Sequence, residues 1–149
     1  MLKYDKRMVD RALRIKIMVV DDEDDIAHVM QKALESEGGF EVDAFTNAKQ
    51  ALEQFKAHAH AYQVVLSDIR MPYIGGLELA KEIRNLNQKV SILLMSALEM
   101  GDRQDFASKL RAARIDGFVE KPISMKKLVE LIRQYVSDLN DSSNRGTPN

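Results

Sequence analysis

The chain has 149 residues, of which 45% are hydrophobic and 30% charged, and its 22 basic and 23 acidic residues leave a net charge of −1. This composition is typical of one globular domain, and the balanced charge gives no general reason to bind nucleic acid or an anionic membrane. The absence of cysteine excludes disulfides, thiolate metal sites and cysteine nucleophiles. No apolar run reaches the roughly 20 residues of a membrane span, and the charged N-terminus lacks a signal peptide's apolar stretch, so we expect a cytoplasmic protein without a membrane partner.

Short apolar runs alternate along the chain with segments in which apolar residues recur at helical spacing. The runs favour strands because they are short and rich in β-branched residues. They cover residues 15–20, 40–45, 62–67, 90–96 and 116–120. The helical segments begin at Asp24, Ala48, Leu77, Gly101 and Met125. Thr46 or Asn47 can cap the second of these helices, and Ser124 caps the last.

The spacing of apolar residues also predicts which faces of three helices point inward. The first helix presents Ile26, Val29, Met30, Ala33 and Leu34. The third presents Leu77, Ala80, Ile83 and Arg84. The fourth is charged and has a thin apolar face of Phe106, Leu110 and Ala113.

This alternation of strands and helices predicts an α/β domain in which helices cover both faces of a parallel sheet. Five strands allow a Rossmann-like or a flavodoxin-like arrangement, and both place a site at the carboxyl ends of the strands, beside the reversal of strand order. We assign the domain to residues 15–139. Residues 1–14 are an N-terminal extension, and the polar residues 140–149 are a disordered tail or the start of a linker.

Chemically active side chains collect where the predicted strands end. Asp21 and Asp22 follow the first strand, Asp68 follows the third, Ser96 ends the fourth and Lys121 follows the fifth. Because parallel strands end at one edge of a sheet, we expect three carboxylates, a hydroxyl and an ammonium in one shallow cleft. Three adjacent carboxylates repel one another, and Mg²⁺, which prefers oxygen ligands, relieves that repulsion. A carboxylate in such a cleft can act as a nucleophile toward phosphorus.

Four motifs at these strand ends, VVDDEDD, LSDIRMP…GG, LLMSA and GFVEKP, together resemble the receiver domain of two-component response regulators. The resemblance covers residues 15–139 and is closest to a chemotaxis-regulator-like single receiver. It implies a flavodoxin-like (βα)₅ doubly wound parallel sheet with strand order 2-1-3-4-5. It also implies a cytoplasmic phosphorelay protein that is not an enzyme. Its partners would be a sensor histidine kinase or phosphotransfer protein and an unknown output protein.

Matched by position, the resemblance implies a role for each acidic residue. Asp68 is the phosphoacceptor. Asp21 and Asp22 hold Mg²⁺ together with Asp68, and Asp22 is the more direct ligand of the pair. Arg70 offers its backbone carbonyl to the metal. Mg²⁺ is therefore the cofactor that the resemblance implies.

The remaining motif positions correspond to contacts with the phosphoryl group and to a conformational switch. Ser96 and Lys121 contact the phosphoryl group, and the Lys121–Pro122 peptide is cis in the family. Ser96 and the aromatic Phe118 form the switch, which changes the face made by the fourth helix, fifth strand and fifth helix. Gly76 matches a glycine of the family, whereas Gly75 replaces its usual aspartate. We expect that replacement to loosen the loop without loss of chemistry.

Other readings of these features stay open at this stage. Asp24 and Asp25 suit the acidic first turn of a helix better than a metal site, and Phe118 can be plain core. An aspartyl phosphatase or mutase fits the acidic spacing poorly, and a nucleotide-binding domain lacks its glycine motifs. A receiver-like module that only binds partners is a further alternative. About ten residues follow Leu139, too few for a helix-turn-helix domain, so we expect no DNA binding.

Overall fold

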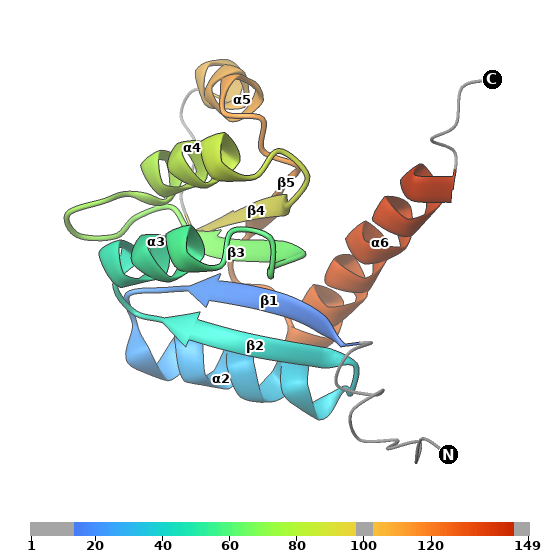
Figure 1. Cartoon of the computed structure of the whole chain (residues 1–149). Coiled ribbons are helices and arrows are strands. Elements are labelled where there is room, and N and C mark those ends of the chain that lie inside the picture. The colour runs from blue at the N-terminus through green and yellow to red at the C-terminus, as the bar shows by residue number, and fades with distance from the viewer. Residues whose placement is uncertain (1–13, 98–102, 145–149) are drawn as a thin grey trace, which may run out of the picture.

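The structure is a computed structural model that describes residues 14–97 and 103–144. Within these ranges strands and helices alternate along the chain, as the sequence predicts (Figure 1). The strands are β1 (Ile15–Val20), β2 (Phe40–Phe45), β3 (Val64–Asp68), β4 (Ser91–Ser96) and β5 (Gly117–Glu120). The helices are α2 (Asp24–Ser36), α3 (Ala48–Ala57), α4 (Gly76–Leu86), α5 (Arg103–Ala112) and α6 (Met125–Asn144). None of these helices is long and apolar enough to cross a membrane.

The strands form one parallel sheet in the order β2-β1-β3-β4-β5. This order confirms the flavodoxin-like arrangement and excludes the Rossmann-like one. The chain passes from β1 outward to β2 and then returns across β1 to β3, so the strand order reverses between β1 and β3. The carboxyl ends of β1 and β3 therefore lie side by side at the position where open α/β sheets place their binding sites.

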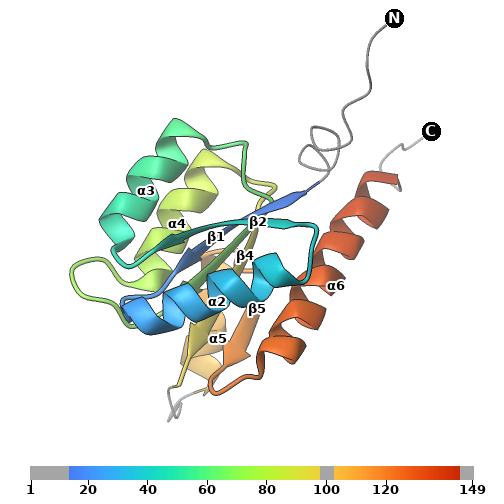
Figure 2. The same ribbon diagram turned by 90° about the horizontal axis from the view of Figure 1, so that it is seen from below.

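Helices cover both faces of the sheet. Helices α2 and α6 lie on one face, and α3 and α4 lie on the other (Figures 1 and 2). Successive residues of β1 alternate between the two cores: Ile17 and Val19 pack toward α2 and α6, whereas Met18 and Val20 pack toward α3 and α4. All four side chains are fully buried. Burial on both faces explains why β1 is a continuous apolar run without polar alternation.

Two predicted helix caps are confirmed. The side-chain oxygen of Asn47 accepts hydrogen bonds from the backbone N–H groups of Lys49 at 2.8 Å and Gln50 at 3.3 Å. The hydroxyl of Ser124 accepts a hydrogen bond from the N–H of Lys127 at 3.2 Å. These caps fix the points at which α3 and α6 begin.

Some details differ from the sequence-based expectation. Strand β3 begins at Val64, not at residue 62, and includes Asp68. In α2, Val29 is 52% exposed and Ala27 is buried, because regular spacing does not decide which of two adjacent helical stripes faces the sheet. Helix α6 continues to Asn144, beyond the domain boundary expected at residue 139. The predicted N-terminal extension, apart from its last residue, lies outside the described residues.

Candidate functional site

Three aspartates meet at the carboxyl edge of the sheet, as the sequence predicts. The register of β1 and β3 pairs Val20 with Ser67, so Asp21 and Asp68, the next residues along, are neighbours. One carboxylate oxygen from each of Asp21, Asp22 and Asp68 lies within 4.8 Å of the other two. Asp21 is fully buried, Asp68 is 9% exposed and Asp22 lies on the exposed rim. The cluster therefore opens to solvent on the side of Asp22.

Lys121 supplies the positive charge that faces this cluster. Its Nζ lies 2.8 Å from Oδ2 of Asp21 and 3.5 Å from Oδ2 of Asp68. The lysine follows β5, which is separated from β3 by β4, so its long side chain reaches across β4 to the aspartates. The Lys121–Pro122 peptide is cis, as the resemblance implies.

Backbone amides hold two of the carboxylates in place. Oδ1 of Asp21 accepts a hydrogen bond from the N–H of Glu23 at 3.0 Å. Oδ1 of Asp68 accepts one from the N–H of Ile69, also at 3.0 Å. Each of these aspartates thus has one oxygen fixed by the backbone and its other oxygen turned toward Lys121.

The surroundings shift the proton affinities of Asp68 and Lys121. Burial raises the pKa of Asp68, and the negative charge of Asp21 raises it further, while the charge of Lys121 lowers it in part. Burial alone would lower the pKa of Lys121, but its hydrogen bond to Asp21 and the charges of Asp21 and Asp68 raise that pKa overall. The site therefore favours any added positive charge that reduces the repulsion between its carboxylates.

The donor set suits a hard divalent cation. When ionised, the three carboxylates carry three negative charges against the single charge of Lys121, which leaves an excess of two. Oxygen ligands of this kind are typical of Mg²⁺ sites. Both oxygens of Asp21 already have partners in Glu23 and Lys121, so Asp22 on the open rim is the better placed of the two for direct ligation.

Gly76 lets α4 begin directly against the phosphoacceptor candidate. Its N–H donates to the carbonyl of Ile69 at 2.8 Å, and a Cβ at this position would clash with the backbone carbonyl of Asp68. A glycine is therefore required here, a requirement that the sequence signalled only through the family resemblance. The neighbouring Gly75 has more room, since a Cβ there would meet its nearest atom at 3.4 Å.

The two proposed switch residues lie on the neighbouring strands β4 and β5. Ser96 ends β4 and is 2% exposed, and its backbone carbonyl accepts from the N–H of Lys121 at 2.9 Å. Phe118 in β5 is partly buried, and its ring packs edge-to-face against Phe106 of α5 with centroids 5.4 Å apart. The sequence placed Phe106 on the thin inner face of its helix but gave no sign that its partner is Phe118.

Comparison with known proteins gives one consistent result. Residues 17–133 match the family described as the response regulator receiver domain. Regulatory protein VanRB of Enterococcus faecalis is 34% identical over 122 residues, which are 80% of this chain and 51% of that protein. The chain spans about half the length of the first curated relatives that it matches.

Solved structures show the same fold. The Francisella response regulator 1452 receiver domain is 26% identical, with a TM-score of 0.71 over 84% of this chain and 98% of that one. A CheY-like response regulator receiver domain protein from Methanospirillum hungatei reaches a TM-score of 0.76 at 22% identity, covering 89% of this chain and 99% of that one.

Proposed function

The chain belongs to the response regulator receiver domain family, and from this premise we propose that Asp68 accepts a phosphoryl group from a sensor histidine kinase or a phosphotransfer protein. Receiver domains act in two-component systems and interact with histidine kinases, so the protein is a signalling module and not a classical enzyme. The observation that carries the proposal is the convergence of Asp21, Asp22 and Asp68 on the ammonium of Lys121. A cytoplasmic location is part of the proposal.

Asp68 would act as the nucleophile. The N–H of Ile69 holds Oδ1, which leaves Oδ2 as the oxygen that attacks phosphorus. A bond forms between Oδ2 and phosphorus as the bond from phosphorus to the donor's imidazole nitrogen breaks. Lys121, already 3.5 Å from Oδ2, would pair with the transferred phosphoryl group. Such a transfer depends mainly on positioning and charge stabilisation, which these contacts supply.

The three aspartates, together with the backbone carbonyl of Arg70, would hold Mg²⁺. When bound, the metal supplies charge neutralisation for the carboxylates and the phosphoryl oxygens. The chain's own contribution is the fixed arrangement of its oxygens, in which Asp21 is buried and Asp22 lies on the rim.

Ser96 and Phe118 would convert phosphorylation into a change of surface. The hydroxyl of Ser96 would bond a phosphoryl oxygen, and Phe118 would leave Phe106 to fill the space that Ser96 vacates. The face made by α5, β5 and α6 would then change its preference for an output partner. The domain would thus have two conformations, and the charge added by phosphorylation would favour one of them.

The mass of the intact protein tests phosphorylation directly. After incubation with a small-molecule phosphodonor and Mg²⁺, the wild-type chain should gain the mass of one phosphoryl group, and Asp68→Asn should gain none. Asp24→Asn is the matched control, because Asp24 lies in the first turn of α2 and outside the aspartate cluster. No gain on the wild type, or an equal gain on Asp68→Asn, would contradict the proposal and favour a module that only binds partners.

A further inference from the structure

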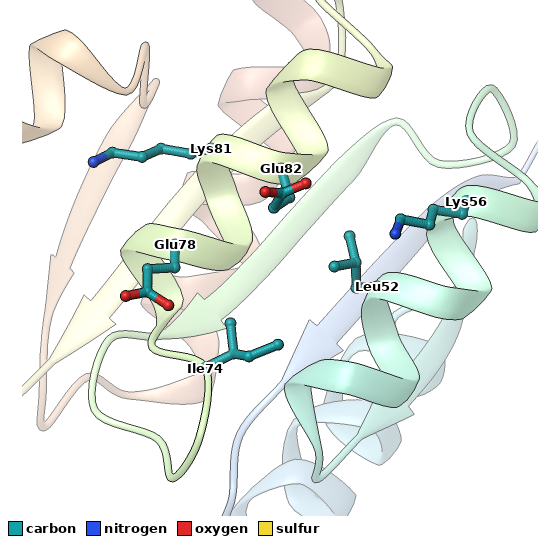
Figure 3. A pocket seen from close by; sticks show the side chains of 6 residues that line it. All are labelled: Leu52, Lys56, Ile74, Glu78, Lys81 and Glu82. Carbon is teal, nitrogen blue, oxygen red and sulfur yellow. The ribbon is translucent and has the colours of Figure 1, made fainter.

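Helix α5 is attached to the sheet less firmly than α3 and α4, which cover the same face. Four residues of α3 and five of α4 are buried. The side chains of Leu52 and Ile74 line a cavity of about 400 Å³ between those two helices, and both pack with the core there (Figure 3). In α5, by contrast, no residue from 105 to 112 is buried. The attachment of α5 therefore depends on a few partly buried side chains.

Phe106 and Leu110 are two of these partly buried side chains of α5. Leu110 packs against the core on the side of α3 and α4. Phe106 packs edge-to-face on Phe118, with the ring centroids 5.4 Å apart and the ring planes at 72°. Aromatic pairs of this geometry attract each other beyond the effect of the area that they bury. Phe106 therefore connects α5 to β5 through the residue that the proposed switch moves.

The backbone of β5 is held along its whole length. The strand pairs with β4 from its first residue to its last. Just before it, the carbonyl of Asp116 accepts a hydrogen bond from the hydroxyl of Tyr135 in α6 at 3.0 Å. Just after it, the N–H of Lys121 donates to the carbonyl of Ser96 at 2.9 Å. A strand fixed at both ends leaves the side chain of Phe118, and not its backbone, as the part that can turn.

The register of the sheet gives that side chain a second direction. Phe118 pairs with Leu94 of β4, and Ser96 lies two residues further along the same strand. Side chains two residues apart in a strand point to the same face of the sheet, so Ser96 and Phe118 share a face of neighbouring strands. The ring of Phe118 can lie against Phe106 of α5 or turn along the sheet toward Ser96, but it cannot do both at once.

Given the proposed phosphorylation of Asp68, on which this inference rests, we propose that Phe106 is a positioning residue of the switch. It stabilises the unphosphorylated conformation by holding Phe118 against α5. When the phosphoryl group draws the hydroxyl of Ser96 toward it, Phe118 turns inward, and α5 loses its aromatic contact and moves away from β5. A change that weakens the contact between the two rings therefore raises the population of the conformation that phosphorylation favours.

The rate at which acetyl phosphate and Mg²⁺ phosphorylate the full chain, followed by the mass of the intact protein, tests this proposal. Phe106→Leu keeps an apolar side chain but removes the ring, and it should raise the rate about two- to tenfold, the effect of one aromatic pair on an equilibrium constant. Phe106→Tyr keeps the ring at a partly exposed position and should retain the wild-type rate. The control is Ser108→Ala, at an exposed position of the same helix, which should also retain that rate.

A double-mutant cycle separates this role from general support of the fold. In a Phe118→Leu background the partner ring is gone, so adding Phe106→Leu should not change the rate further, whereas a merely structural role would give the same change in both backgrounds. Amide hydrogen exchange of the unphosphorylated chain gives a second readout. Phe106→Leu should speed exchange in α5 and leave β5 unchanged, and phosphorylation of the wild type should have the same effect.

The outcomes distinguish this proposal from the proposed function. If the wild type gains the mass of a phosphoryl group but Phe106→Leu gains it no faster, Phe106 does not hold the switch and only this proposal fails. The same conclusion follows if the effect of Phe106→Leu persists in the Phe118→Leu background, or if exchange in β5 rises together with that in α5. If the wild type gains no mass, the proposed function fails and this proposal fails with it.

Discussion

Two clusters of charged side chains lie at opposite edges of the sheet, and they are organised differently. At the carboxyl edge, Lys121 faces three aspartates. At the amino edge, Arg84 of α4 is 5% exposed and pairs with Asp116, just before β5, at 2.8 Å. Both clusters connect segments far apart in the sequence, but only one of them has balanced charge.

The cluster around Arg84 satisfies every group that it buries. The guanidinium makes five hydrogen bonds, to the carbonyls of Gln88 and Val90, twice to that of Arg114, and to the carboxylate of Asp116. A guanidinium has five N–H donors, so none is left over. The same oxygen of Asp116 also accepts from the N–H of Ile92 at 2.7 Å. This arrangement joins the end of α4 to the starts of β4 and β5 and leaves nothing for a ligand to add.

The aspartate cluster lacks that balance. Three carboxylates share one ammonium, and burial raises the pKa of Asp68. Unbalanced charge weakens the folded state but creates affinity for a cation. In this molecule the completely satisfied cluster is structural, and the incompletely satisfied one is the candidate site.

The largest expected effect comes from breaking the balanced cluster. Arg84→Met keeps a long side chain but removes the charge and all five donors, which leaves Asp116 and several carbonyls without their partner. Because the buried carbonyls lose their donors, whereas the side chain of Asp116 is 40% exposed and can be hydrated, we expect the free energy of unfolding to fall by about 3 kcal/mol. Urea denaturation, monitored by circular dichroism, measures this free energy. The control is Lys81→Met, on an exposed position of the same helix, which should change the free energy of unfolding by less than about 0.5 kcal/mol. Equal losses of stability in the two variants would show that the hydrogen bonds of Arg84 do not stabilise the fold.

The unbalanced cluster should respond instead to a cation. With Mg²⁺ at about 100 times its dissociation constant, binding to the folded state alone adds about 2.7 kcal/mol of stability. The melting temperature of the wild type should therefore rise with Mg²⁺, and Asp22→Ala should remove most of the rise. Asp25→Ala, in the first turn of α2, should keep it. An Asp22→Ala variant that responds to Mg²⁺ like the wild type would show that the metal is held elsewhere.

A smaller effect should appear on neutralising one carboxylate in the absence of divalent cations. The folded-state pKa of Asp68 is raised, so its contribution to stability is fully present below its unfolded pKa, about pH 4, and is lost as the pH rises through the folded value. Asp68→Asn cannot ionise and avoids that loss. It should melt above the wild type at pH 7, and the difference should shrink as the pH falls toward 4. If the melting temperature of Asp68→Asn rises further above that of the wild type as the pH falls, the pKa of Asp68 is not raised in the folded state.

Much of this molecule is predictable from local patterns. Apolar runs and helical spacing located the strands and helices, and the parallel sheet implied by their alternation brings Asp21, Asp22, Asp68 and Lys121 together as expected. The strand order itself came from the resemblance, because the alternation alone allowed two arrangements. The alternation of strands and helices along the sequence therefore predicts which residues reach an edge of the sheet. The order of the strands within the sheet decides which of those residues are neighbours.

The features that escaped prediction depend on contacts between distant segments. Spacing placed Arg84 on an inner helical face, but its acceptors come from loops that precede two different strands. Phe106 meets Phe118 only because α5 lies over β5 in the folded chain. Val29 follows the apolar period of α2 and still faces solvent, since periodicity does not decide which of two adjacent helical stripes faces the sheet.

The ion pair between Lys121 and Asp21 joins residues 100 positions apart. A ribosome delivers the chain from its N-terminus, so both acidic residues of the first motif and Asp68 emerge long before the lysine that faces them. Contacts of such long sequence separation also form late, because the intervening chain must be ordered before they can close. A nascent or partly folded molecule therefore carries the carboxylates without their counter-charge. Only a domain in which β5 has joined the sheet has a complete site, so the phosphotransfer proposed for Asp68 would wait for this late step of folding.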